Sequence, residues 1–95
     1  MAADVLVFVA SGCGACHDYM PKFTRLARPL HDQRRIRVQV IDLARGGPGA
    51  ALAAQHKIEA TPTTIVLRPG RKPHKRVGSL DEAEIQKLLT LAAGA

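Results

Sequence analysis

The chain has 95 residues, of which 46% are hydrophobic and 23% are charged, and its formal net charge is +6 at pH 7. This is the composition of a folded globular chain long enough for one modest core, so we expect a single domain over residues 1–95. No apolar run approaches the roughly 20 residues that a membrane span requires. The first four residues include no basic side chain, and the apolar run after them is too short for a secretory signal, so we expect a cytoplasmic protein.

Residues 5–10 form a continuous apolar run rich in valine, which predicts a strand buried on both faces of a sheet. From Cys13 onward, apolar residues recur at steps of three and four, which predicts an amphipathic helix. Pro21 lies inside this pattern and predicts a kink, and Pro29 predicts either the end of the regular helix or the start of a looser final turn. The apolar stripe consists of Cys16, Tyr19, Met20, Phe23, Leu26, Ala27 and Leu30.

The middle of the chain predicts a second strand and a second helix. β-branched residues from Ile36 to Ile41 predict a strand that ends near Asp42. Glycines dominate residues 45–49, where we expect a loop. Pro48 in this loop suits the start of a helix, and we expect a short alanine-rich helix over residues 50–57.

The remaining segments predict a hairpin and a final helix. Residues 63–67 predict a strand, residues 68–73 a turn, and residues 75–78 a strand that returns beside the first. Ser79 is followed three positions later by Glu82, the spacing of a capping box, which predicts the start of a helix. The predicted order is β-α-β-α-β-β-α, which indicates an α/β fold with one four-stranded mixed sheet and helices on both faces.

Cys13 and Cys16 are the only cysteines in the chain, and they stand where the first strand turns into the first helix. The unpaired N–H groups and the dipole of a helix N-terminus favour an anion, which stabilises the reactive thiolate of Cys13. Cys16 lies one turn further on, close enough to close a small disulfide ring. One close pair cannot form a structural disulfide framework, so the spacing favours redox or metal chemistry, and reversible disulfide formation above all.

Four features of the chain, in this order, resemble the thioredoxin superfamily in a compact form without the extra N-terminal strand and helix of full thioredoxins. They are the Cys13-Gly14-Ala15-Cys16 motif, Pro21 in the following helix, the Ile58–Thr63 segment with Thr61 and Pro62, and Gly78 within the Val77–Leu80 segment. The resemblance covers nearly the whole chain. It implies a thioredoxin-like fold with a cis peptide bond before Pro62, facing the cysteines, and a main chain at Thr61 that pairs with an extended substrate segment.

The resemblance further implies a thiol–disulfide oxidoreductase that reduces protein disulfides. Cys13 would be the attacking thiol and Cys16 the resolving thiol. A shallow substrate groove would be lined by Gly12, Ala15 and Gly78. The chemistry implies no cofactor and no metal. The expected partners are disulfide-containing proteins and a reductase or small thiol that restores the dithiol, and we expect a monomer that binds neither a membrane nor nucleic acid.

Two residues around the cysteines depart from the pattern of thioredoxins. Gly12 replaces the tryptophan before the first cysteine, and Ala15 replaces the usual proline before the second. The chain also lacks the Cys-Pro-Tyr-Cys motif of glutaredoxins, so it lies between these two classes.

A third departure concerns the proton of the second cysteine. Val7 stands at the position of the buried acid that relays this proton in thioredoxins, and the lysine partner of that acid falls on Val38 or Val40. We therefore expect no carboxylate to assist the deprotonation of Cys16. His17, next to the second cysteine, is the candidate proton shuttle.

Other interpretations use the same residues. Cys13-Gly14-Ala15-Cys16-His17 also matches the c-type haem attachment motif, with Met20 or His31 as a second axial ligand, but the strands on either side argue against a small cytochrome. The cysteine pair is half of a zinc site, yet no second ligand pair follows it.

The basic stretch from Arg68 to Arg76 invites a nucleic-acid interpretation. It contains no aromatic side chain to stack on a base and falls on a turn, so we expect a solvated tip or a contact with an acidic protein. The remaining alternative is a thioredoxin-fold module that binds a partner without catalysis.

Overall fold

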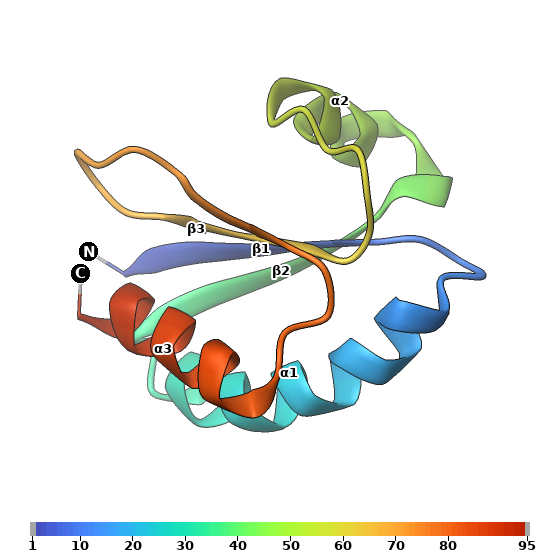
Figure 1. Cartoon of the computed structure of the whole chain (residues 1–95). Coiled ribbons are helices and arrows are strands. Elements are labelled where there is room, and N and C mark those ends of the chain that lie inside the picture. Colours follow the sequence, from blue (N-terminus) through green and yellow to red (C-terminus); the bar gives the residue numbers. More distant parts are fainter. Residues whose placement is uncertain (1, 95) are drawn as a thin grey trace.

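The computed structural model describes residues 2–94 and has an α/β fold with one four-stranded sheet (Figure 1). Helix α2 covers one face of the sheet, and helices α1 and α3 cover the other. The observed order confirms the predicted fold, with one short 3₁₀ helix, η1, in addition. No helix within residues 2–94 is long and apolar enough to cross a bilayer. The elements are β1 (Ala3–Val9), α1 (Gly14–Asp32), β2 (Ile36–Asp42), η1 (Leu43–Arg45), α2 (Gly47–Gln55), β3 (Thr63–Leu67), β4 (His74–Val77) and α3 (Glu82–Ala93).

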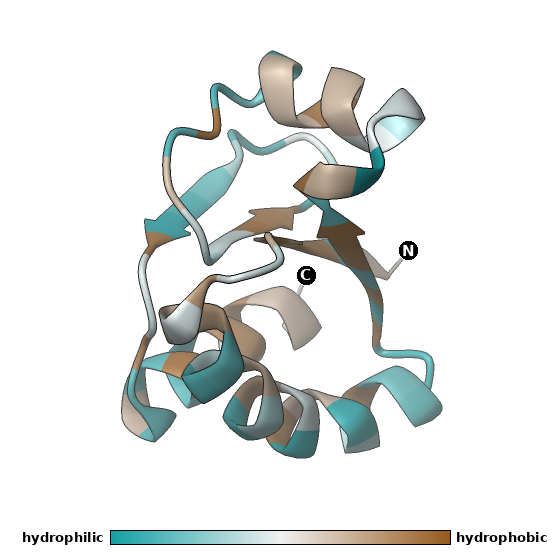
Figure 2. Ribbon diagram, turned by 90° about the vertical axis from the view of Figure 1, so that its right-hand side faces the viewer, coloured by the Kyte–Doolittle hydropathy of each residue, from teal (hydrophilic) through white to brown (hydrophobic). Residues whose placement is uncertain are grey.

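Strand β1 lies inside the sheet, whose strand order is β2-β1-β3-β4. It pairs parallel with β2 and antiparallel with β3, and β3 pairs antiparallel with β4, so the sheet is mixed as predicted. Val5 and Val7 belong to the core under α1 and α3, whereas Leu6 and Phe8 belong to the core under α2. Both faces of β1 are therefore buried, which explains its uninterrupted apolar sequence, and Figure 2 shows the hydrophobic residues concentrated in the middle of the sheet.

Helix α1 continues through both of its prolines to Asp32, so of the two alternatives predicted at Pro29, the end of the regular helix is wrong. A proline removes one main-chain hydrogen bond, but Phe23 and Ala27 are buried in the core and hold the preceding turns against the sheet. The chain leaves the helix at Arg34, whose φ of 59° is in the left-handed region.

Helix α2 spans Gly47–Gln55. It overlaps the predicted range of 50–57, but both of its ends lie a few residues earlier in the chain. Pro48 lies in its first turn as expected, where the missing N–H has no intrahelical partner to lose. The loop predicted at residues 45–49 is reduced to Gly46, because η1 ends at Arg45 and α2 begins at Gly47. The side chain of Asp42 starts η1 by accepting the N–H of Ala44 at 2.9 Å.

The capping box of α3 is formed by Asp81 and Glu84, which corrects the prediction of Ser79 and Glu82. The Asp81 carboxylate accepts the N–H of Glu84 at 2.8 Å, and the Glu84 carboxylate accepts the N–H of Asp81 at 3.2 Å. Both pairs have the same spacing in the sequence. The structure uses the later pair because Leu80 is buried in the core before the helix begins.

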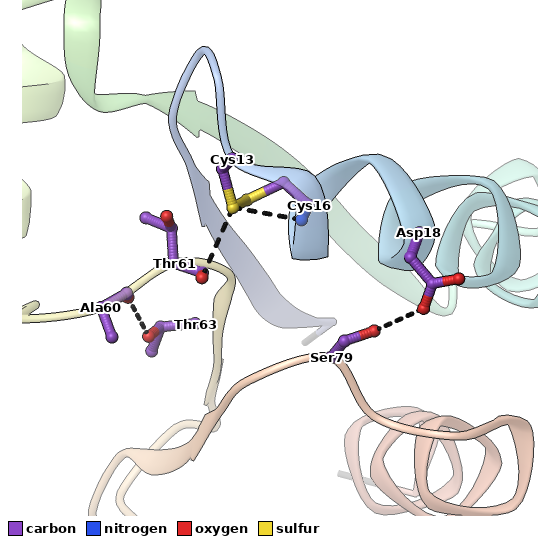
Figure 3. The surroundings of a disulfide bond; sticks show 7 residues. All are labelled: Cys13, Cys16, Asp18, Ala60, Thr61, Thr63 and Ser79. Carbon is purple, nitrogen blue, oxygen red and sulfur yellow. Dashed lines mark hydrogen bonds between the residues drawn. A yellow bond between two sulfur atoms is a disulfide. The ribbon is translucent and has the colours of Figure 1, made fainter.

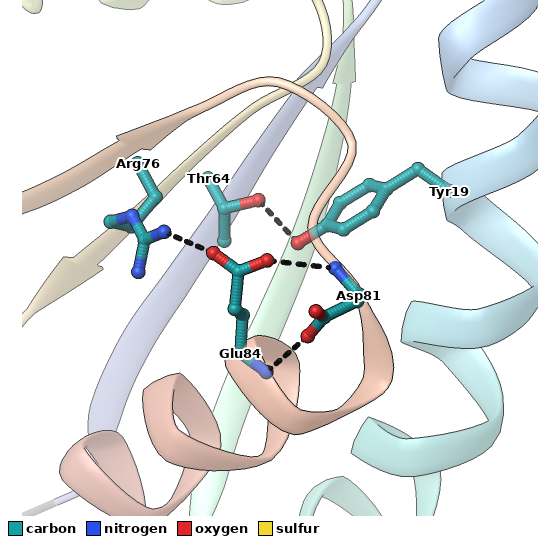
Figure 4. A network of polar contacts seen from close by, with 5 residues as sticks. All are labelled: Tyr19, Thr64, Arg76, Asp81 and Glu84. Atoms are coloured by element: carbon teal, nitrogen blue, oxygen red, sulfur yellow. Dashed lines mark hydrogen bonds and ion pairs between the residues drawn. The ribbon is translucent and has the colours of Figure 1, made fainter.

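A buried hydrogen bond joins α1 to β3. The hydroxyl oxygens of Tyr19 and Thr64, two fully buried residues, lie 2.8 Å apart (Figure 4). Burial raises the pKa of the Tyr19 phenol, which therefore stays uncharged at neutral pH. Next to this pair, Arg76 of β4 donates to Glu84 of α3 at 2.6 Å. These contacts fix the positions of α1, β3, β4 and α3 relative to one another.

We expect Tyr19→Phe to lower the free energy of unfolding by about 1–3 kcal/mol, because the Thr64 hydroxyl stays buried and loses its partner. Urea unfolding followed by circular dichroism measures this change. In the double variant Tyr19→Phe/Thr64→Val both polar groups are gone, so its cost should be smaller than the sum of the two single costs. Additive costs would contradict a direct bond between the two hydroxyls.

Candidate active site

Residues 10–13 turn the chain from the end of β1 into the first turn of α1, and Cys13 is the N-cap of that helix. The Sγ of Cys13 accepts the N–H of Cys16 at 3.1 Å, and its carbonyl oxygen accepts the N–H of His17 at 3.2 Å. The first helical turn contains no acidic side chain. The positive end of the helix dipole therefore acts on the Cys13 sulfur without a neighbouring negative charge in that turn, which favours a thiolate there.

Cys13 and Cys16 are joined by a disulfide, with their Cα atoms 5.2 Å apart (Figure 3). This Cα separation is ordinary for a disulfide. The two residues differ in access: Cys16 is buried, with 5% of its surface exposed, whereas Cys13 is only partly buried. A molecule that approaches the disulfide from solvent therefore meets Cys13 first.

The Thr61–Pro62 peptide bond is cis, as predicted, and it lies beside the disulfide. The carbonyl oxygen of Thr61 is 3.5 Å from the Sγ of Cys13 (Figure 3). The N–H of Gly78 donates to the carbonyl oxygen of Pro62 at 2.8 Å, and the φ of Gly78 is +97°, a conformation that favours glycine. Three segments that are far apart in the sequence thus meet at one end of the sheet.

A polar contact fixes the segment after Gly78 against the active-site helix. The Ser79 hydroxyl donates to the Asp18 carboxylate at 3.0 Å (Figure 3). The Nζ of Lys22 lies 3.3 Å from the same carboxylate oxygen. The bond from Ser79 and the nearby Lys22 ammonium lower the pKa of the Asp18 carboxyl. The charged contact is therefore retained at neutral pH and is lost as pH falls through this lowered pKa.

A hollow beside the disulfide lies on a side of Cys16 for which the sequence provided no prediction. It has a volume of about 1220 Å³, and its lining includes Gly12, Cys16, His17, Met20 and Asp42. The other predicted groove residues, Ala15, Thr61, Pro62 and Gly78, do not line it. The sequence provided little signal for this hollow, because its walls come from one side of α1, the end of β1 with the following loop, and Asp42 at the end of β2.

Val7 is fully buried, and the register pairs it with Val40 of β2. Thr63 and Thr64 are the only buried polar residues among positions 2–94. No carboxylate is among the buried side chains of residues 2–94. His17 is exposed and lines the same hollow as Cys16.

A disulfide at the N-cap of a helix, opposite a cis proline on a four-stranded mixed sheet, defines a class of domains built for thiol–disulfide exchange. The chain belongs to the thioredoxin family, because the family model described as Thioredoxin matches residues 2–91. The predicted class of chemistry is thereby confirmed: this is a thioredoxin-type thiol–disulfide oxidoreductase with a Cys13–Cys16 disulfide.

Known thioredoxins are similar over most of this chain. The thioredoxin H-type of Fagopyrum esculentum is 29% identical over 84 residues, which are 88% of this chain and 67% of that protein. Thioredoxin H2-1 of Oryza sativa subsp. japonica is 32% identical over 85 residues, which are 90% of this chain and 56% of that protein. The X-ray structure of Fasciola hepatica thioredoxin has a TM-score of 0.78 and 22% identity, and covers 96% of this chain and 81% of that one. The chain thus spans between just over half and two thirds of the two plant proteins.

The haem and zinc interpretations gain no support. The cysteines lie beside a sheet in a thioredoxin fold, whereas a small cytochrome would be helical. Within residues 2–94, no three His, Cys, Asp or Glu side chains come together in a group that could hold a metal ion.

Proposed function

We propose that this chain reduces disulfide bonds in protein substrates, with Cys13 as the attacking thiol and Cys16 as the resolving thiol. One observation carries the proposal: Cys16 is 5% exposed, whereas the more accessible Cys13 lies against the main chain of Thr61. Cys13 is also the sulfur at the helix N-terminus, where a thiolate is best stabilised.

The proposed reaction has two exchange steps. The Cys13 thiolate attacks one sulfur of the substrate disulfide, forms a mixed disulfide and releases the other substrate sulfur as a thiolate. Cys16 then loses its proton and attacks the Sγ of Cys13. The mixed disulfide breaks, the second substrate sulfur leaves as a thiolate that takes up a proton, and the Cys13–Cys16 bond remains. The substrate is reduced by two electrons, and the dithiol is oxidised by two.

The substrate is proposed to bind as an extended segment along the main chain of Thr61, beside Pro62. The contact between the Thr61 carbonyl and the Cys13 sulfur supports this position, because a segment paired there would pass directly over the disulfide. Gly12, Ala15 and Gly78 present little side chain to such a segment and would form the walls of a shallow groove.

We assign the proton shuttle to His17. It follows Cys16 directly, is exposed to solvent, and lines the hollow into which Cys16 opens. A ring nitrogen of the imidazole can accept the Cys16 proton, and no buried carboxylate within residues 2–94 competes for it.

The proposal also covers the oligomeric state of the chain, its location, its electron donor and its substrates. The chain acts as a single monomeric domain over residues 1–95 in the cytoplasm, without a cofactor or metal. A thiol-dependent reductase or a small thiol of the glutathione type restores its dithiol. Its substrates are folded proteins with accessible disulfides.

Insulin reduction driven by dithiothreitol tests the activity. We expect the wild-type chain to accelerate the appearance of turbidity, because reduced insulin B chain precipitates. A wild-type rate equal to the dithiothreitol background would overturn catalysis and favour a module that only binds.

Redox titration of the Cys13–Cys16 pair against glutathione tests the direction of the reaction. Reductants and oxidants of this class differ by roughly 150 mV, which corresponds to about 7 kcal/mol for a two-electron couple. We expect a potential near the reducing end, about −270 mV, as in thioredoxin. A potential near −120 mV would contradict the reductase proposal and indicate an oxidant.

A further inference from the structure

The positive charge of the chain is concentrated at the end of the sheet that lies away from the disulfide. The register pairs Ala3 with Ile36 and Asp4 with Leu67 at this end, whereas Val9 leads into the active-site loop at the other. The rise of about 3.3 Å per strand residue separates the two ends of β1 by about 20 Å. In Figure 1 the turn between β3 and β4 and both chain ends lie at this end, and the loop after β1 lies at the opposite one.

Two arginine-rich segments meet at this end of the sheet. One leads into β2 over residues 34–37, and the other follows β3 over residues 68–72. We call their six cationic side chains the basic pole: Arg34, Arg35, Arg37, Arg68, Arg71 and Lys72. With Asp4 and Asp32 as the acids of the same end, six cations against two acids give a formal net charge of +4, out of +6 for the chain.

The basic pole is accessible and mostly uncompensated. All of its side chains are exposed except Arg68, which is partly buried. Arg37 pairs with the Asp4 carboxylate through two hydrogen bonds of 2.8 and 3.1 Å. Within residues 2–94, the other five cations form no ion pair. Four exposed positive charges, with the partly buried Arg68 beside them, therefore face solvent where an external anion can approach.

The spacing of the two segments suits one extended anionic chain. Strands β2 and β3 flank β1, so the strand ends from which the two segments extend are about 10 Å apart. This distance is close to the Debye length of about 8 Å at physiological ionic strength, so both segments act on the same partner segment. Five of the six cations are arginines, whose planar donor groups bind carboxylates in a bidentate manner.

We propose that the basic pole is a docking surface for an acidic segment of a partner protein. The pole contains no aromatic side chain on which a nucleic-acid base could stack, and it presents a turn and a strand start rather than a helix for a groove. The large hydrophobic residues exposed within residues 2–94 are Val40 and Val77, and neither belongs to the pole. The pole thus lacks the apolar side chains that anchor a protein in a bilayer.

Docking at this end leaves the disulfide free. Because the pole and the disulfide lie about 20 Å apart along the sheet, a partner held at the pole does not cover Cys13. The docked domain can exchange electrons with a disulfide of that partner or of a protein bound next to it. This inference concerns a surface outside the catalytic site and stands independently of the proposed direction of the reaction.

Binding of a fluorescein-labelled oligoglutamate peptide, followed by fluorescence anisotropy, tests the proposal. The test variant is Arg34→Glu/Arg35→Glu/Arg71→Glu. The control, Arg45→Glu/Lys57→Glu/Lys87→Glu, changes the net charge equally at exposed residues outside the pole. Each variant includes one residue with positive φ, 59° at Arg34 and 54° at Lys57, so the backbone demands are matched. Circular dichroism establishes that both variants are folded.

We expect the test variant to bind the peptide roughly tenfold more weakly than the control, because three exposed attractions become repulsions. Equal weakening in both variants would show an effect of net charge alone and would overturn the docking surface. Absence of peptide binding by the wild type would also overturn it. Tighter, pole-dependent binding to duplex DNA or to phosphatidylserine vesicles would overturn the choice of an acidic protein. Both variants should reduce insulin at the wild-type rate, because the basic pole lies away from the disulfide. A wild-type chain that fails to reduce insulin would count against the catalytic proposal but not against the docking surface.

Discussion

Cys13→Ser is expected to reduce turnover to the background rate, whereas Cys16→Ser is expected to retain the first exchange step and accumulate mixed disulfides. The reason is the difference in access between the two residues, since Cys16 is 5% exposed and Cys13 meets the solvent. A free thiol at position 13 can attack a substrate, but without Cys16 no internal thiol releases it. Trapping of substrate proteins, followed by non-reducing electrophoresis and mass spectrometry, measures the mixed disulfides.

The control for this experiment is the double variant Cys13→Ser/Cys16→Ser, which should trap nothing. In the reduced wild type, iodoacetamide should modify Cys13 much faster than Cys16 at pH 7, because a thiolate is stabilised at the N-cap and the second thiol is buried. Equal trapping by the two single variants would contradict the assignment of attacking and resolving thiols.

Val7→Asp is expected to destabilise the protein by about 3–5 kcal/mol at pH 7, because it places an ionisable carboxyl without a partner in the core. Val7 is fully buried and lies between β2 and β3. Burial disfavours the charged form, so the carboxyl introduced at this position would have a raised pKa in the folded state. Urea unfolding at several pH values measures the cost.

The sign of the pH dependence follows from this raised pKa. Below about pH 4 the carboxyl is neutral in both states and the electrostatic cost is absent; the cost then grows as pH rises toward the folded-state pKa. Val7→Asn is the matched control, because it buries a polar group of the same shape that does not titrate. A cost that is the same at pH 3 and pH 7 in both variants would contradict an ionisation penalty.

The same variant tests the proton path of the second step. In the wild type, burial disfavours the thiolate of Cys16, so we expect turnover to rise with pH more steeply than the alkylation rate of Cys13. In the folded fraction of the Val7→Asp variant, the new carboxylate should accept the Cys16 proton. The mixed disulfide should then be released faster than in the wild type near pH 7. If wild-type turnover follows only the titration of Cys13, the second step does not limit the rate and Val7 serves packing alone.

Local sequence signals determined the elements and the reactive pair. The apolar run of β1 predicts a strand buried on both faces because alternate side chains of a central strand point into two different cores. Cys13 and Cys16 are three residues apart, so the first helical turn alone brings them together. The cis bond before Pro62 followed from the resemblance to thioredoxins rather than from any local propensity.

Local sequence signals did not determine the helix boundaries that depend on tertiary packing. Pro29 does not end the regular helix, because Phe23 and Ala27, buried within the two turns before it, hold α1 against the sheet. Two capping boxes of equal spacing were available before α3, and burial of Leu80 selected the one at Asp81 and Glu84. In both cases the free energy of tertiary packing outweighs a local preference, which is about 3 kcal/mol for a proline inside a helix and about 1 kcal/mol for an N-cap.

Only the tertiary structure decided which distant residues meet. Thr61 lies 48 positions after Cys13, yet its carbonyl oxygen is 3.5 Å from the Cys13 sulfur, because β1 and β3 are adjacent and antiparallel. The basic pole likewise joins residues 34–37 with residues 68–72, of which only the second segment stood out as a basic run. Strand order sets these distances, and strand order is fixed by the burial of complete sheet faces rather than by the sequence of any one segment.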